Sequence, residues 1–209
     1  MRKFISLTIF GIAMGFLEAA VVVYLRDIIY PEGFCFPLKD IPVNLLFVEL
    51  GREVATIIML ITIGIIAGKT LVEKFSYFLF SFGIWDIFYY IWLKASLNWP
   101  PSLFTDDILF LIPIHWVGPI IAPVIVSLTM ITFSLITVYF LDKGYIFKPN
   151  KFDWLLICIT CIIIFISFIL DFPQMIAHKI SSPYRWELLI TGELLVLFAF
   201  IRICRRKKV

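Results

Sequence analysis

Six long apolar stretches run through this chain, and each is long enough to cross a lipid bilayer as a helix. A spanning helix needs about 20 mostly apolar residues, because the hydrocarbon core is about 30 Å thick. Backbone polar groups in lipid must be satisfied inside the protein, which favours helices over irregular chain. The sequence therefore predicts an all-α, polytopic integral membrane protein, a bundle of about six transmembrane helices. The predicted spans lie near residues 4–25, 43–67, 75–95, 119–141, 152–172 and 186–203.

The composition is that of a membrane protein along the whole chain. Hydrophobic residues make up 62% of the 209 residues, charged residues only 16%, and the mean hydropathy is +1.02. Soluble domains are about 45–50% apolar and about 25% charged. We therefore expect residues 1–209 to form a single transmembrane domain whose main partner is the lipid bilayer. The net charge of +3 comes mainly from the termini and one set of loops, so no nucleic-acid partner is indicated.

The orientation in the membrane follows from the distribution of basic residues. Twelve of the 18 Lys and Arg residues lie at the two termini and in the second and fourth connections, whereas five lie in the other connections. Loops rich in Lys and Arg stay on the cytoplasmic side. The sequence thus predicts a multi-pass protein of the cell (inner) membrane with cytoplasmic N- and C-termini. Cys35, in the first connection, then lies outside, and Cys204 lies inside.

Ionisable residues inside the predicted spans gather in the half nearer the outer side. At a rise of about 1.5 Å per residue, they lie about 9–15 Å below the outer ends of their helices. Charges in hydrocarbon are costly and are kept where a partner, a water-filled cavity or a function requires them. The pattern predicts one polar cavity open to the outer side, lined by Glu18, Glu49, Arg52, Glu53, Asp86 and Glu193.

The second span carries a polar stripe at helical spacing. Glu49, Arg52, Glu53 and Thr56 follow i, i+3, i+4 and i+7, so they share one face. One interpretation is a structural ion pair that lets the helix carry its charges. The other is a functional site, in which the two carboxylates act as acid and base and Arg52 binds an anionic group through its fork of donors.

The third span carries a second polar group. Asp86 and Tyr90 are one turn apart, and Trp85 and Tyr89 lie beside them in the sequence. The tyrosines either satisfy a buried carboxylate or form a binding site together with Trp85 and a catalytic Asp86. On the first span, Gly11 and Gly15 have the spacing that lets helices approach closely, and this packing would draw the nearby Glu18 into the bundle.

Residues 96–123 are the least regular part of the chain and hold five of its eleven prolines. The segment near 99–118 is too short and too interrupted to span, so we expect a re-entrant or interfacial segment. Ser102 or Thr105 would cap a short helix that carries Asp107 in its first turn, where acidic residues are favourable. A turn would then return the chain to the fourth span.

His115 and Trp116 follow within the same segment. His115 could carry a proton, although a lone His beside Trp is more often simply hydrogen-bonded. With two His residues in the chain, no metal centre is predicted, and no cofactor can be named. An all-oxygen cation site is less attractive beside Arg52.

Three functions remain open from the sequence. The first is a membrane enzyme that uses carboxylates as acid and base on a lipid or lipid-linked substrate. The second is a proton- or ion-coupled transporter of a small solute, and the third is a non-catalytic subunit or assembly factor, as a homo-oligomer or in a membrane complex. The candidate catalytic residues are Glu18, Glu49, Glu53, Asp86 and Asp107. The candidate binding residues are Arg52, Trp85, Tyr89, Tyr90, His115 and Trp116.

Overall fold

The computed structural model describes residues 2–32, 42–112, 114–170 and 184–206. Each of the six predicted spans coincides with a helix along most of its length. Cys35, in the predicted first connection, lies outside the described ranges. The helices are α1 (Arg2–Ile29), α2 (Val43–Ala67), α3 (Leu71–Leu97), α4 (Ile121–Asp142), α5 (Lys151–Ile169) and α7 (Trp186–Arg205). Two strands, β1 (Asp106–Phe110) and β2 (Trp116–Pro119), lie between α3 and α4 in the sequence.

The predicted all-helical class is confirmed, and four of the helices are long and apolar enough to cross a membrane: α1, α2, α4 and α5. The other two are more polar. The middle of α3 holds Asp86 among several Tyr and Trp residues, and α7 carries two glutamates and two arginines. At about 1.5 Å per residue, the 27 residues of α3 and the 20 residues of α7 still reach about 40 Å and about 30 Å.

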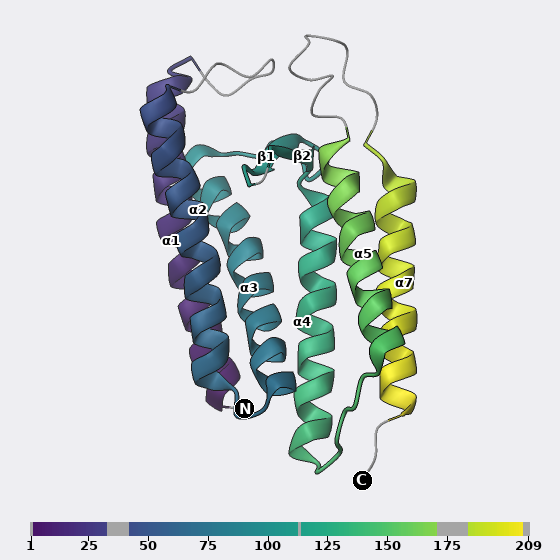
Figure 1. Cartoon of the computed structure of the whole chain (residues 1–209). Helices are drawn as coiled ribbons and strands as arrows, with labels where there is room; N and C mark the ends of the chain where they lie inside the picture. Colours follow the sequence, from purple (N-terminus) through teal and green to yellow (C-terminus); the bar gives the residue numbers. More distant parts are fainter. Residues whose placement is uncertain (1, 33–41, 113, 171–183, 207–209) are drawn as a thin grey trace.

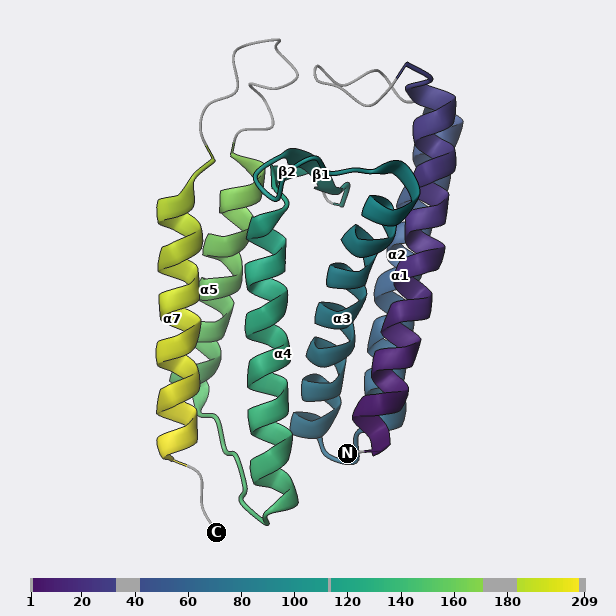
Figure 2. The same ribbon diagram turned by 180° about the vertical axis from the view of Figure 1, so that it is seen from behind.

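The helices run side by side in two groups of three (Figures 1 and 2). One group holds α1, α2 and α3, and the other holds α4, α5 and α7. The groups meet mainly where α3 packs against α4. Both termini lie at one end of the bundle, and the β1–β2 hairpin lies at the opposite end, above the gap between α3 and α4 in the views shown.

Glycines allow α1 to lie directly against α3. A Cβ on Gly15 would come 3.0 Å from the amide nitrogen of Tyr89 and 3.1 Å from the carbonyl oxygen of Trp85. A Cβ on Gly11 would come 2.7 Å from the side chain of Ile84. The packing role predicted for these glycines is confirmed. Glu18, one turn further along α1, is only 5% exposed.

Local signals at the helix ends fix where α3 and α5 begin. The Thr70 side chain accepts a hydrogen bond from the amide of Glu73 at the start of α3. Asn150 and Asp153 form a reciprocal capping box at the start of α5. Such caps satisfy amides that have no partner within the helix. The cap at Thr70 thereby fixes the register of α3, which carries Asp86 and both tyrosines.

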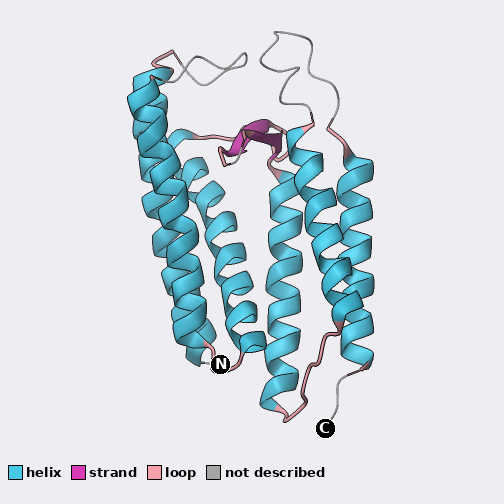
Figure 3. Cartoon of the chain, viewed as in Figure 1, coloured by secondary structure: helices cyan, strands magenta, loops and turns pink. Residues whose placement is uncertain are grey.

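The prediction of a short helix near residues 99–118 is wrong, because the segment forms an antiparallel hairpin (Figure 3). Asp106 pairs with Pro119, Asp107 with Gly118 and Ile108 with Val117. Pro113 divides the segment into pieces of a few residues, and helices that short are unstable because nucleation is costly. Two paired strands satisfy each other's backbone groups instead. The segment belongs to no transmembrane helix in the described ranges.

Candidate functional site

Arg52 joins two buried glutamates from two helices. Its guanidinium donates to Glu49 of the same helix through Nε at 3.0 Å and Nη2 at 2.9 Å, and it donates to Glu18 of α1 through Nη1. The Thr56 hydroxyl donates to the other oxygen of Glu18 at 2.7 Å. Glu18 and Glu49 are 5% and 3% exposed. The predicted stripe on α2 is thus an ion-paired clamp that binds α1 to α2.

Glu53 lies on the same face of α2, but its hydrogen-bond partner is the hairpin segment and not Arg52. The backbone amide of Leu111, just after β1, donates to both carboxylate oxygens of Glu53 at 2.9 and 3.0 Å. Glu53 is 3% exposed and makes no ion pair in the parts of the chain that are described. It therefore holds the end of β1 against α2.

Asp107 of β1 forms a second charged cluster with two residues that the sequence analysis did not select. Nη2 of Arg26 lies 2.9 Å from both carboxylate oxygens, and the indole of Trp99 donates to one of them at 3.3 Å. The guanidinium also lies 4.9 Å from the centroid of the Trp99 ring. Burial raises the pKa of Asp107, while the charge of Arg26 and these hydrogen bonds oppose the change.

A sequence signal for Arg26 did exist. It lies eight residues after Glu18, about two turns along the same face of α1. Its position near the end of the apolar stretch made it look like a loop charge. The proximity of Trp99 to Asp107 had no comparable signal, because it depends on how the chain turns after α3.

Asp86 has a different environment from the other acids. It is half-buried on α3 and accepts a hydrogen bond from the Ser127 hydroxyl of α4 at 2.8 Å. Within the described ranges it makes no other hydrogen bond and no ion pair. Tyr89 and Tyr90 lie within electrostatic range of both Asp86 and Asp107. Asp86 therefore differs from Glu18, Glu49 and Asp107, because its carboxylate makes no ion pair with an arginine among the described residues.

The tyrosine hydroxyls complete this polar layer. The side chains of Tyr89 and Tyr90 make no hydrogen bond among the described residues. Each hydroxyl group keeps some exposed surface. Tyr89 also lies within electrostatic range of Arg26 and Arg52. The layer therefore connects α1, α2, α3, α4 and β1. Its five carboxyl groups outnumber its two guanidinium groups, so the layer holds an excess of acidic groups.

Three further candidate binding residues are Trp85, Trp116 and His115. Trp85 packs in an apolar cluster with Met14 and Leu60. The Trp116 indole donates to the carbonyl of Ile112 at 2.8 Å, and its ring stacks on Phe168 of α5 with centroids 5.9 Å apart. His115 is half-buried, and burial lowers its pKa. Trp116 therefore anchors the hairpin to α5, on the side opposite the glutamates of α2.

Glu193 is also separate from this layer, although its depth suggested a shared cavity. It accepts a hydrogen bond from the Thr129 hydroxyl of α4 at 2.7 Å. It lines a cavity between α3, α4, α5 and α7. A similar depth along the helices does not bring Glu193 to the other acids. Glu193 belongs to α7, and its side chain meets Thr129 of α4, whereas Glu18, Glu49 and Glu53 belong to α1 and α2.

These observations define an all-helical protein, with four helices able to cross a membrane, that holds a charged layer beneath a β-hairpin. No family model matches the chain, and neither a curated protein nor a solved structure matches it.

Proposed function

We propose that the protein crosses the inner membrane six times, with both termini in the cytoplasm and the hairpin at the outer side. An even number of passes is supported by the two termini, which lie at the same end of the bundle (Figure 1). The lengths of α3 and α7 allow these helices to span together with the four more apolar ones. The excess of Lys and Arg at the termini supports the orientation.

Thiol labelling in intact cells tests this topology. A membrane-impermeant maleimide should label Cys35 and should not label Cys204 until the cells are lysed. Cys35→Ser should abolish the labelling of intact cells, and Cys204→Ser should abolish the additional labelling seen after lysis. Labelling of Cys204 in intact cells, with Cys35 protected, would reverse the orientation and place the hairpin on the cytoplasmic side.

We further propose that the charged layer is the site of a membrane enzyme that acts on a lipid or lipid-linked substrate from the outer leaflet. The environment of Asp86 is the observation that carries this proposal. The other four carboxylates of the layer are engaged by an arginine or a backbone amide. Asp86 has one hydroxyl partner, and Ser127 leaves its second oxygen available for a proton.

The remaining residues fit the binding of a polar headgroup. Tyr89 and Tyr90 lie beside Asp86 with hydroxyls that can donate to a substrate oxygen. The side chain of Arg52 is 20% exposed, whereas the side chains of its partners Glu18 and Glu49 are 7% and 4% exposed, so Arg52 is the most accessible charged group of the clamp. An arginine can bind a phosphate or carboxylate through two parallel hydrogen bonds. In this proposal Asp86 transfers the proton, and the tyrosines and Arg52 position the substrate.

A substrate need not be known in advance to test the role of Asp86. In cells that lack the protein, comparative lipid mass spectrometry should show a lipid that accumulates and is consumed again when the wild type is expressed. Asp86→Asn should fail to restore its consumption, with activity reduced at least about 100-fold, because general acid–base groups contribute about 10²–10⁴-fold. Asp142→Asn, at the exposed end of α4, should restore it fully.

Equal amounts of folded, inserted protein must be confirmed for both variants. Full restoration by Asp86→Asn would exclude Asp86 as the proton-transfer group. Unchanged lipids combined with a solute flux in proteoliposomes that Asp86→Asn abolishes would favour a proton-coupled transporter instead.

A further inference from the structure

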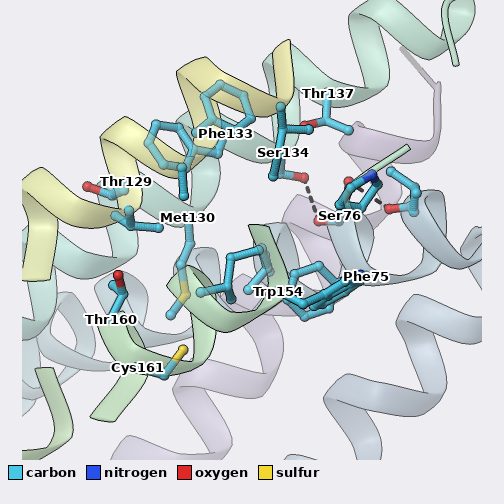
Figure 4. Close-up of a pocket in the computed structure, with 18 of the residues that line it drawn as sticks. Phe75, Ser76, Thr129, Met130, Phe133, Ser134, Thr137, Trp154, Thr160 and Cys161 are labelled. Carbon is cyan, nitrogen blue, oxygen red and sulfur yellow. Dashed lines mark hydrogen bonds between the residues drawn. The ribbon is translucent and has the colours of Figure 1, made fainter. Parts of the chain in front are cut away.

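A cavity lies between α3, α4, α5 and α7, and its lining includes no residue of the hairpin. Its volume is about 400 Å³, within the range of about 300–1,000 Å³ that is usual for small-molecule sites. Most of its lining is aliphatic or aromatic. Figure 4 shows part of the lining, with Thr129 and Met130 on α4 and Thr160 and Cys161 on α5.

Two polar groups in this lining lack the partners that buried groups need. Oε2 of Glu193 accepts from Thr129, but Oε1 is enclosed and has no hydrogen-bond partner among the described residues. The Thr160 hydroxyl is likewise enclosed and unpartnered, in a residue that is 2% exposed. Most buried polar atoms in proteins are hydrogen-bonded, because an unsatisfied one costs about 1–3 kcal/mol.

The cavity is elongated along the helices. On α7 its lining runs from Glu193 to Ile203, and on α4 it runs from Val126 to Thr137. Each of these stretches is about 15 Å long at a rise of about 1.5 Å per residue. Glu193 lies at one end, and Phe147 and Pro149 of the α4–α5 connection lie toward the other. The space thus matches a chain-like apolar molecule with a polar group at one tip.

We propose that this cavity binds a membrane-soluble ligand with a long apolar body and one terminal hydrogen-bond donor, which donates to Glu193. A hydroxyl or an ammonium group would serve as the donor, and Thr160 would supply a second hydrogen bond nearby. The apolar body lies against the side chains of α4, α5 and α7. This site is independent of the enzymatic role proposed for Asp86.

Photocrosslinking of the full chain in lipid nanodiscs tests the proposal. The probes are dodecylamine, dodecanol and dodecane, each with a diazirine at the end remote from the donor. The amine or the alcohol should label peptides of α4, α5 and α7 that line the cavity, and its unlabelled form should compete. Glu193→Met should weaken this labelling by about tenfold or more, as expected for the loss of a hydrogen bond to a charged group.

Further variants distinguish the two donors and control for folding. Glu193→Gln removes the charge but keeps an acceptor oxygen, so it should weaken labelling by the amine and spare labelling by the alcohol. Glu187→Met, on the exposed side of the same helix, should change neither. The competition in the wild type needs no variant and therefore stands even if Glu193→Met folds poorly. Equal labelling by dodecane without competition, or no labelling of these peptides by any probe, would overturn the proposal.

Discussion

Replacing Arg52 with Met should cost about 3–5 kcal/mol of stability, the usual result of removing one partner from a buried ion pair. Arg52 is the common partner of Glu18 and Glu49, so its loss leaves two buried carboxylates without a counter-charge. It also removes one of the two side-chain links between α1 and α2 and leaves only the hydrogen bond from Thr56 to Glu18 among the described residues. The measurement is the free energy of unfolding of the purified protein in mixed micelles, titrated with sodium dodecyl sulfate.

Two further variants show whether the cost comes from stranded charge. Arg185→Met removes an arginine whose distance to the exposed Glu187 is 3.9 Å, and an exposed pair of this kind contributes only about 0–1 kcal/mol. The triple variant Glu18→Gln, Glu49→Gln and Arg52→Met should regain most of the lost stability, because no isolated charge remains. If the triple variant is no more stable than Arg52→Met alone, the clamp does not act through charge.

Replacing Arg26 with Met should release the hairpin from the bundle. Asp107 is 1% exposed, and among the described residues it would keep only Trp99 and the Ile108 amide as donors, without a positive charge. The expected cost is again about 3–5 kcal/mol, which corresponds to amide exchange at least about 100-fold faster in β1 and β2. Hydrogen–deuterium exchange with mass spectrometry, in detergent or nanodiscs, measures this directly.

Arg2→Met, at the exposed start of the same helix, is the matched control and should leave the exchange of the hairpin unchanged. Arg26→Lys should have an intermediate effect, since it keeps the charge but loses the planar group that lies over the Trp99 ring. Unchanged protection of residues 106–110 in Arg26→Met would show that Glu53 and Trp116 hold the hairpin without Asp107.

The sequence was informative wherever periodicity or length decided the outcome. The six helices, the shared face of Glu49, Arg52 and Glu53, and the packing role of Gly11 and Gly15 all follow from spacing along one helix. Contacts between segments that are distant in the sequence could not be predicted from such spacing. Helical spacing places Glu53 beside Arg52, but it cannot show that the amide of Leu111, 58 residues away, is its partner.

The irregular segment shows a related limit. Prolines and an acidic pair suggested a capped helix, but these features describe each half of the segment separately. The pairing of Asp107 with Gly118 is a contact between the halves, and no local pattern announces it. The same reason explains why Ser127 was not selected as the partner of Asp86: the two meet only because α4 packs against α3.

The attachments of the hairpin have a mechanical consequence. Glu53 and Arg26 tie β1 to α2 and α1, whereas Trp116 of β2 packs on Phe168 of α5. The hairpin thus connects the group of α1, α2 and α3 to the group of α4, α5 and α7, which otherwise meet mainly along α3 and α4. Any rocking of one group against the other must stretch or break one of these ties. A ligand that competes for the Leu111 amide or for Arg26 would therefore set how far the groups can part.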